Sequence, residues 1–272
     1  MPELPEVETI ARGLDKRLAG EQIESVWLGS KPEPLKSSAE EISTTLNGRT
    51  ISRVRRAGKH IVFDLVSKKN GAVEDQAQWI VHLGMTGSLR ISPSEAELPK
   101  HTHAILRLSS GRELRFVDPR RFGRLSVIGK FEAPGAEPLQ ISLEDFVRRF
   151  RGRKTPIKSA LLNQKLLSGV GNIYADEGLF RAKVRPRRRA ASLTRDELRR
   201  LRVSLKQVLK EAIRAGGSSI SDYVDANGDE GFFQLKHRVY GREAKPCLVC
   251  KTPVKRIVIA GRSSHYCPRC QK

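Results

Sequence analysis

The chain has 272 residues and 38% hydrophobic content, enough for one large domain or two ordinary ones with real cores. It carries 51 Lys and Arg against 30 Asp and Glu, a formal net charge of +21. No apolar run approaches the roughly 18 residues of a membrane span, and the acidic N-terminus is not a signal peptide. These features exclude a membrane-embedded protein, and we expect a cytoplasmic one.

The positive charge indicates a polyanionic partner, which is either nucleic acid or an anionic membrane surface. The sequence has no basic amphipathic helix with a bulky aromatic face, so nucleic acid is favoured. Arginine outnumbers lysine, which suits bidentate contacts with phosphate. The alternative is a basic surface that is simply solvated.

The N-terminal stretch from Met1 to Glu6 contains a candidate nucleophile. If Met1 is removed, Pro2 becomes the terminus, and its secondary amine is partly unprotonated and nucleophilic near neutral pH. Two carboxylates, Glu3 and Glu6, follow within one helical turn. The simpler interpretation is an ordinary helix start, where proline and acidic residues are common.

A helix followed by strands is predicted for the first half of the chain. Residues 7–19 have apolar side chains at helical spacing and end before a glycine. From about residue 22 to 130 the pattern is strand-like, with apolar runs at 61–66 and 79–83 and a hairpin signal between the runs 104–108 and 114–117. Strands at this spacing favour an antiparallel sandwich over a parallel sheet.

The second half of the chain is predicted to be helical. Ser142 opens one predicted helix, Thr155 with Pro156 opens another, and residues 194–215 form a long helix that begins with a capping box. A glycine-rich turn at 168–172 joins two of the helices.

Three parts of the chain follow from this pattern, which is of the α+β class. They are an N-terminal sandwich over residues 1–131, a helical domain over 139–234 that includes a polar loop at 216–234, and a small cysteine module over 237–272. A Pro/Gly-rich linker at 132–138 separates the first two parts. We expect the loop to be mobile.

All four cysteines belong to one pattern, Cys247-x2-Cys250-x16-Cys267-x2-Cys270. Two knuckles of this spacing suit tetrahedral Zn²⁺, and two disulfides are the alternative, which an otherwise cysteine-free cytosolic chain disfavours. Four ligands leave no open position, so the predicted zinc ion is structural. The residues between the pairs predict a β-hairpin with Arg262 near its tip, where it is able to reach a phosphate.

Two further stretches suit contact with DNA. The glycine turn Gly169–Asn172 precedes a helix, and its backbone N–H groups are suited to hold a phosphate oxygen, although such a turn is usually only a connection. The segment 118–123 places Arg120 and Phe122 at a loop tip, where they are suited to enter a base stack, and Met85 is a second candidate wedge. The simpler interpretations are a solvated hairpin and a core methionine.

These motifs together resemble one family. The stretches 2–9, 82–87, 118–123, 169–174 and 265–272 closely resemble those of bacterial formamidopyrimidine-DNA glycosylases, bifunctional repair enzymes acting on oxidised purines, and they occur in the family's order. The resemblance implies an N-terminal β-sandwich with flanking helices, a helix–two-turn–helix DNA-binding domain and a zinc-finger hairpin. It also implies that a monomer binds double-stranded DNA in the cleft between the two halves, with one structural Zn²⁺.

The resemblance also implies a role for each matching residue. Pro2 is expected to form the Schiff base, Glu3 to act as general acid, and Glu6 to support the pocket. Lys59 is the expected donor for β-elimination and Arg262 for δ-elimination. The expected wedge residues are Met85, Arg120 and Phe122. The expected DNA-binding residues are His82, His101, Arg120, Arg153, Lys158, Asn172, Tyr240 and Arg262.

The implied reaction is chemically coherent. A damaged base, such as 8-oxoguanine or a formamidopyrimidine, must leave the stack before its glycosidic carbon can be attacked. An amine nucleophile forms an iminium at that carbon, which acidifies the neighbouring hydrogen and permits strand cleavage, while a nearby carboxylic acid protonates the ring oxygen of the sugar. No catalytic metal or redox cofactor is required.

Two positions depart from the family pattern. Ser221 stands in the loop after the long helix where some members have a lysine, which puts the lesion preference in doubt. Lys251 replaces a glycine that is common after the second cysteine, which does not affect metal binding.

Two other functions compete with this interpretation. A sister branch that prefers oxidised pyrimidines shares the fold, but it usually has glycine where this chain has Leu4. A zinc-ribbon protein that only binds DNA predicts no covalent chemistry.

Overall fold

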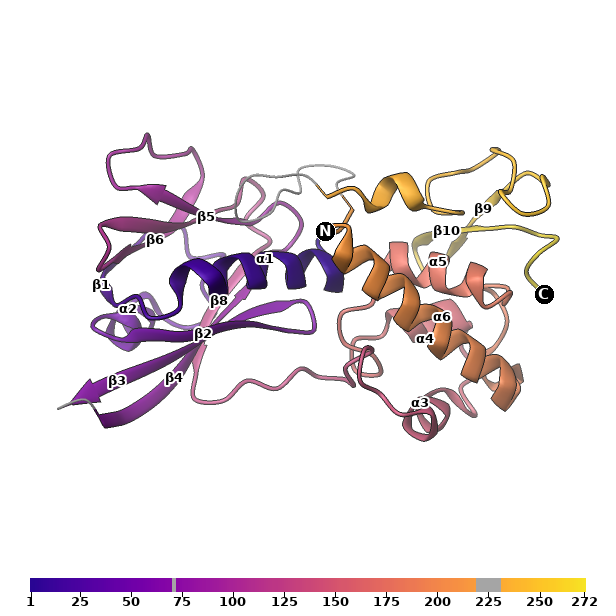
Figure 1. Ribbon diagram of the computed structural model, residues 1–272, viewed down its shortest axis with the longest axis horizontal. Coiled ribbons are helices and arrows are strands. Elements are labelled where there is room, and N and C mark those ends of the chain that lie inside the picture. Colours follow the sequence, from indigo (N-terminus) through magenta and orange to yellow (C-terminus); the bar gives the residue numbers. More distant parts are fainter. Residues whose placement is uncertain (70–71, 219–230) are drawn as a thin grey trace. The chain divides into compact units, whose positions relative to one another are not determined.

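The strand-rich first half forms two antiparallel four-stranded sheets (Figure 1). One sheet has the order β1-β6-β7-β5 and the other β2-β3-β4-β8. The strands are β1 (Ile23–Leu28), β2 (Thr50–Ala57), β3 (His60–Lys69), β4 (Ala72–His82), β5 (Ser88–Pro93), β6 (Thr102–Leu108), β7 (Arg112–Val117) and β8 (Arg124–Ile128). The predicted antiparallel architecture is confirmed.

The two sheets share one apolar core, which makes them a sandwich. Phe63 and Trp79 of one sheet pack with their ring centroids 4.7 Å apart, and they belong to the same buried cluster as Phe116 of the other sheet. The apolar face of helix α1 (Leu4–Leu18) adds side chains such as Val7 and Leu14. The predicted helix is present, and it begins three residues earlier than the sequence pattern indicated.

Helix α2 (Ala39–Leu46) was not predicted. The Ser38 hydroxyl caps it by accepting a hydrogen bond from the backbone N–H of Glu41 at 3.0 Å. Ile42 and Leu46 bury its apolar face in the same core.

The second half is helical around a separate core. Its helices are α3 (Leu143–Phe150), α4 (Ile157–Leu162), α5 (Asn172–Arg181) and α6 (Arg195–Arg214), with short 3₁₀ turns η1 (Ala190–Ser192) and η2 (Phe233–Lys236). The Ser142 cap and the capping box of Thr194 and Glu197 are both present. Helix α4 has Pro156 as its N-cap without a side-chain hydrogen bond, so Thr155 does not cap it.

Helix α5 is buried along almost its whole length. Every residue from 173 to 180 is buried, including the charged Asp176 and Glu177. Gly178 allows close packing on α6, because a β-carbon there would lie 3.2 Å from a methyl of Leu205. The two charged side chains therefore need partners inside the fold.

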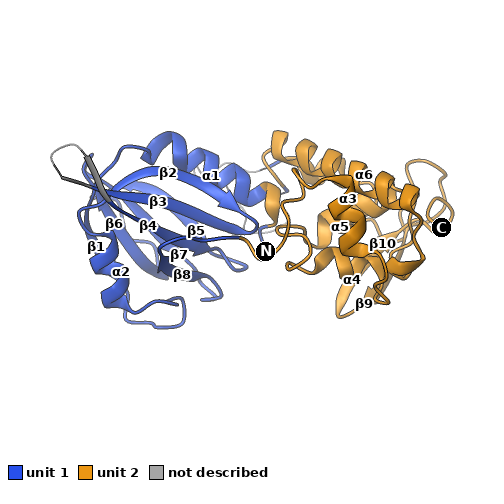
Figure 2. Ribbon diagram, turned by 90° about the horizontal axis from the view of Figure 1, so that it is seen from below, with its two compact units in different colours: residues 1–2, 6–132, 218–231 blue, residues 3–5, 133–217, 232–272 orange. Residues whose placement is uncertain are grey.

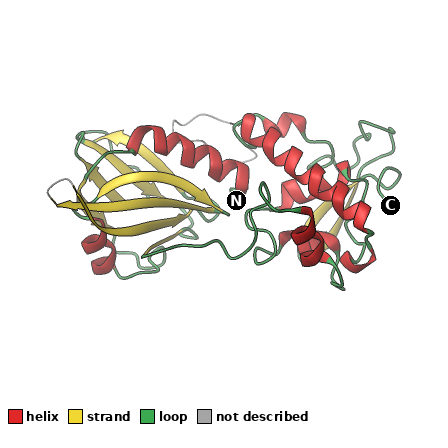
Figure 3. Ribbon diagram, turned by 60° about the horizontal axis from the view of Figure 1, so that its bottom comes forward, coloured by secondary structure: helices red, strands yellow, loops and turns green. Residues whose placement is uncertain are grey.

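The C-terminal hairpin has the predicted form (Figure 3). Strands β9 (Lys255–Ile259) and β10 (Arg262–Tyr266) pair antiparallel, with Arg262 opposite Ile259. A two-residue turn therefore separates them, and Arg262 lies at the hairpin tip.

The computed structural model describes residues 1–69, 72–218 and 231–272, and the chain divides into two units (Figure 2). Unit 1 comprises residues 1–2, 6–132 and 218–231, and unit 2 comprises 3–5, 133–217 and 232–272. Ser221 and most of the loop predicted at 216–234 lie outside the described residues. In the described part of the chain, no helix has the length and apolar character needed to cross a membrane.

Candidate active site and zinc site

The N-terminal stretch leads into helix α1 and is held in place by the carboxylates of Glu3 and Glu6. Pro2 is half-buried, whereas the Met1 side chain before it is 47% exposed. Glu3 and Glu6 are both buried. A processed terminus at Pro2 would therefore directly precede a residue, Glu3, whose carboxylate is already fixed.

Glu3 is held by the N-terminal end of helix α5. Its carboxylate accepts hydrogen bonds from the backbone N–H groups of Ile173 at 3.0 Å and Tyr174 at 3.4 Å. The positive end of a helix dipole favours a negative charge at this place. Gly171 makes the approach possible, since a β-carbon there would overlap with the carboxyl carbon of Glu3.

This arrangement involves the first turn of α5, directly after the glycine turn. Glu3 accepts from the N–H groups of residues 173 and 174, whereas the predicted phosphate contact concerns the N–H groups of Gly169–Asn172 and stays a prediction. The turn also receives the backbone N–H of Leu4 on the carbonyl of Gly169 at 3.0 Å. Its main role in this structure is to fix the residue next to Pro2.

Glu6 connects α1 to the segment after α6. Its carboxylate accepts a hydrogen bond from the backbone N–H of Ser218 at 2.8 Å. Glu6 therefore fixes the chain at Ser218, four residues beyond the end of α6.

Lys59 lies in the two-residue turn between β2 and β3 and is 8% exposed. The strand before it is anchored by Arg56, which donates to the Glu8 carboxylate at 2.7 Å and to the Gly58 carbonyl at 3.3 Å. Burial by itself would raise the pKa of Glu8, but Arg56 and Arg12 outweigh it and lower the pKa. The Glu8–Arg56 ion pair therefore links α1 to the turn that carries Lys59.

The three predicted wedge residues lie exposed on two loops of unit 1. Met85 is 43% exposed and Phe122 is 51% exposed, so the core interpretation of Met85 is wrong. The Arg120 guanidinium lies over the Phe122 ring at 4.8 Å from its centroid, a cation–π contact.

Buried Asp118 connects the two wedge loops. It accepts hydrogen bonds from the Thr86 hydroxyl at 2.5 Å and from the backbone N–H of Gly123 at 2.7 Å. The loops also touch directly, since a β-carbon on Gly84 would lie 2.5 Å from the carbonyl carbon of Phe122. Both wedge loops therefore form one rigid assembly.

His82 supports the loop that carries Met85. Its Nδ1 accepts the backbone N–H of Gly84 at 3.1 Å, and its ring lies 5.0 Å from that of His60. Burial lowers the pKa of His82 to about 4, with smaller contributions from His60, Lys59 and Arg124. The neutral imidazole is therefore the acceptor at neutral pH. His101, also of unit 1, is exposed at the end of the loop between β5 and β6.

Lys158 does not have the surface position that was predicted for a phosphate contact. Its side chain is fully buried, and its amine lies 2.7 Å from the Asp176 carboxylate and donates to the Ser263 carbonyl at 2.5 Å. Asp176 also accepts the backbone N–H of His265 at 2.8 Å. Lys158 therefore joins α4, α5 and the finger hairpin, and its amine is not available to DNA.

The other predicted backbone contacts of unit 2 lie around the start of α5 and the hairpin. The side-chain amide of Asn172 donates to the Ser263 hydroxyl at 3.2 Å, while the oxygen of the same amide is buried without a partner. Tyr240 stacks edge-on against His265 at 5.2 Å, and Arg262 at the hairpin tip is exposed. Arg153 is exposed beyond α3 and donates to the Arg149 carbonyl. Asn172, Tyr240 and Arg262 thus share one region, and Arg153 belongs to another loop.

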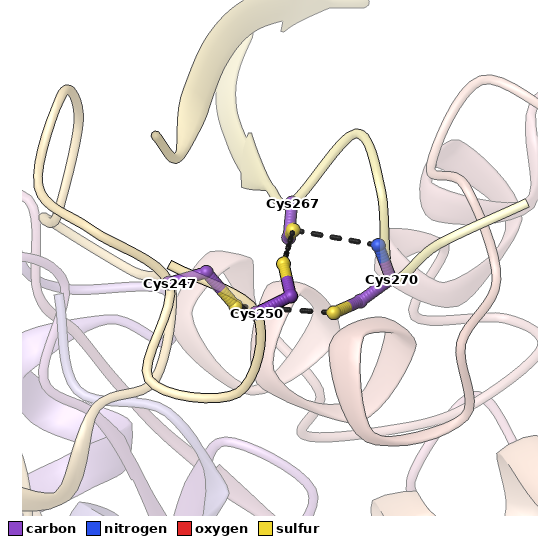
Figure 4. Close-up of side chains that lie close together, drawn as sticks. All are labelled: Cys247, Cys250, Cys267 and Cys270. Carbon is purple, nitrogen blue, oxygen red and sulfur yellow. Dashed lines mark hydrogen bonds between the residues drawn. The ribbon is translucent and has the colours of Figure 1, made fainter. Parts of the chain in front are cut away.

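The four cysteines form a metal site of the predicted kind (Figure 4). Their sulfur atoms all lie within 4.8 Å of one another, and none is in a disulfide. The Cys250–Cys267 and Cys247–Cys270 sulfur pairs are 3.4 and 3.9 Å apart. Tetrahedral Zn²⁺ with Zn–S bonds of about 2.3 Å requires sulfurs about 3.8 Å apart, so the residues fit one structural ion with no open position.

Family models match the chain along almost its whole length. Residues 1–125 match the formamidopyrimidine-DNA glycosylase N-terminal domain, residues 133–224 match its H2TH domain, and residues 244–272 match a zinc finger found in FPG and IleRS. The chain belongs to the formamidopyrimidine-DNA glycosylase family.

Full-length relatives agree with this assignment. The formamidopyrimidine-DNA glycosylase of Solibacter usitatus is 44% identical, with both chains covered completely. A structure of a Lactococcus lactis Fpg variant with Fapy-dG-containing DNA matches at a TM-score of 0.89, with 33% identity and full coverage of both chains. A structure of MutM with DNA containing carbocyclic 8-oxo-G matches at a TM-score of 0.88, again with 33% identity and full coverage.

Sequence reasoning missed three residues that hold the site together. The pattern of segment 118–123 predicted no role for Asp118, and the helical pattern predicted none for Asp176 and Glu177. A signal for the last two was available, because two adjacent acidic residues interrupt the apolar run of α5. Buried charges of this kind indicate internal partners.

Proposed function

We propose that this protein uses the amine of Pro2, freed by removal of Met1, as the nucleophile of a bifunctional DNA glycosylase. It is a base-excision repair enzyme that removes oxidised purines such as 8-oxoguanine and formamidopyrimidines, and it then cleaves the abasic strand. The observation that carries the proposal is the Glu3 carboxylate, next to Pro2 in sequence and fixed by two N–H groups of α5.

Each chemical step has a candidate residue. The Pro2 amine attacks the sugar carbon as the base leaves, and Glu3, which must be protonated for this step, protonates the ring oxygen and opens the sugar. The resulting iminium acidifies the neighbouring hydrogen, so β-elimination and then δ-elimination cleave the strand. We assign the donors for these steps to Lys59 and Arg262, and the support of the pocket to Glu6.

The DNA-facing residues are proposed on exposure and position. Met85, Arg120 and Phe122 fill the space left by the extruded base, which suits their exposed and linked loops. Backbone phosphates are assigned to His82, His101, Arg120, Arg153, Asn172, Tyr240 and Arg262. Lys158 instead positions the hairpin that carries Arg262.

The domain boundaries and cellular location remain proposals. We place the catalytic sandwich at 1–131, the linker at 132–138, the helix–two-turn–helix domain at 139–234 and the zinc finger at 237–272. The chain changes from unit 1 to unit 2 after Glu132, which supports the linker position. We propose that the protein acts as a monomer in the cytoplasm, on nucleoid DNA.

Excision assays test the substrate. The enzyme should release 8-oxoguanine opposite cytosine faster than oxidised thymine from otherwise identical duplexes. A preference for the pyrimidine would instead assign the chain to the sister branch. The variant Glu3→Gln should lower the excision rate by about 10²-fold or more, the usual contribution of a general acid.

A further inference from the structure

A basic cavity lies between the C-terminal parts of helices α5 and α6. Its volume is about 550 Å³, within the range of roughly 300–1,000 Å³ that is common for small-molecule sites. The charged residues that line it are Arg181, Lys210, Glu211, Arg214 and Arg238. Four of these five side chains are cationic, so the cavity carries three net positive charges.

Arg181 is the least exposed of the charged side chains that line the cavity. It makes a two-bonded ion pair with Glu211 at 2.9 and 2.8 Å, which links α5 to α6. Its side chain is only 12% exposed, and its Nε–H is buried without a partner. A buried donor without an acceptor is unfavourable, so an acceptor bound in the cavity would stabilise the protein.

The remaining cations have no ion pair or hydrogen bond from their side chains to any residue in the described ranges. Lys210 and Arg214 project from one face of α6, four residues apart, and both are exposed. Arg181 lowers the pKa of Glu211, and Arg238 and Arg214 lower it further. Among the described residues that line the cavity, Glu211 has the one carboxylate. It is therefore charged, and it is already bound to Arg181.

Helix ends do not account for all of this charge. Arg181 and Arg214 lie in the last turns of their helices, where cations are generally favourable. Arg238 belongs to neither helix, and its backbone N–H is fixed by the buried Glu177 carboxylate at 3.0 Å. A third segment therefore brings an additional cation to the cavity.

We propose that this cavity binds a phosphate group. Guanidinium groups offer several N–H donors in a planar arrangement that matches phosphate oxygens, and three net positive charges offset a phosphate dianion. The group is carried either by a DNA strand or by a free phosphate compound. Only the DNA case rests on the proposed function.

Inorganic phosphate is the first probe. In an NMR titration of the full-length protein, the Nε–H resonance of Arg181, identified by its loss in Arg181→Lys, should shift and saturate. The double variant Arg214→Gln/Arg238→Gln should bind phosphate at least tenfold more weakly. The matched control Arg200→Gln removes one exposed charge from the same helix at a position that does not line the cavity, and it should behave as wild type.

The salt dependence of binding to a long duplex distinguishes the two sources. If a DNA strand supplies the phosphate, the double variant should lower the slope of log K against log salt by about 0.9 for each lost contact, relative to Arg200→Gln. If the slope equals that of the control, a free phosphate compound is the ligand. An Arg181 resonance that phosphate does not shift would overturn the proposal. Borohydride trapping of the same variants reports separately on the proposed function.

Discussion

At the scale of single residues, the fixed position of Glu3 depends on the absence of a side chain at Gly171. We predict that Gly171→Ala displaces the Glu3 carboxylate from the start of α5, because the added methyl occupies its place. The excision rate should fall at least tenfold, since general acid catalysis contributes about 10²–10⁴-fold. Single-turnover kinetics on an 8-oxoguanine duplex measure the effect.

Gly129→Ala is the control, because a β-carbon at Gly129 has no neighbour within 4 Å. This variant should retain the wild-type rate. Equal rates for both variants would show that the contact between Glu3 and α5 is not needed for catalysis.

The half-buried imidazole of His82 predicts a pH dependence of stability. Its pKa is lowered by burial to about 4, below the 6.5 of a free histidine, so the unfolded chain takes up a proton at higher pH than the folded one. The stabilisation that the neutral His82 side chain gives to the folded state is therefore complete above pH 6.5 and is lost as the pH falls toward 4. Its upper bound is about 3 kcal/mol, from 1.36 kcal/mol per pKa unit.

The variant His82→Asn tests whether His82 causes this pH dependence, because an amide oxygen is able to accept the Gly84 N–H without titrating. Its free energy of unfolding should fall less steeply than that of wild type between pH 6.5 and 4. Parallel pH profiles from urea unfolding would contradict the assignment. His60, whose pKa burial lowers, and His237, whose pKa burial lowers to about 4, remain in both proteins and contribute to the residual slope.

At the scale of elements, Asp118 holds the two wedge loops together. We predict that Asp118→Asn reduces the free energy of unfolding by about 1.5–3 kcal/mol, the usual loss for a hydrogen bond to a charged group. The amide still accepts from Thr86, but its NH₂ faces the Gly123 N–H. Excision from duplex DNA should fall at the same time, because the wedge loses its rigid support.

Thr86→Val provides the comparison, since it removes the hydroxyl bond to Asp118 and the long 3.4 Å bond that the hydroxyl accepts from the Arg120 N–H, and it should cost about 1 kcal/mol. Denaturant unfolding and excision assays of both variants check whether Asp118→Asn loses more stability and activity than Thr86→Val. An Asp118→Asn protein with wild-type stability and excision would show that the loops hold their positions without the carboxylate.

The elements differ in how well the sequence predicts them. Strong local signals predicted strands β3, β4, β6 and β7, the capped helices α3 and α6, and the hairpin between the cysteine pairs. Helix α2 was not predicted although Ser38 and Glu41 form a cap signal, because only Ile42 and Leu46 form its buried apolar face. The burial of Lys158 was not predictable, since its partner Asp176 lies on another helix and Ser263 lies 105 residues away.

At the scale of the whole molecule, the zinc site stabilises more than its own hairpin. Ser263 and His265 of the hairpin are partners of the buried Lys158–Asp176 pair, so loss of the metal exposes that pair. We predict that chelation of Zn²⁺ lowers the melting temperature of unit 2 and weakens DNA binding, while unit 1 unfolds as before. Calorimetry with and without chelator measures this, and a uniform shift or no shift would contradict it.

The central claim is that the chain forms a covalent intermediate through the amine of Pro2. Borohydride trapping with DNA that contains an abasic site, together with mass spectrometry of the N-terminus, tests it most directly. We predict a stable protein–DNA adduct for protein that begins at Pro2, and no adduct for Pro2→Gly or for protein that retains Met1. Processed wild-type protein that binds this DNA but is never trapped would contradict the claim.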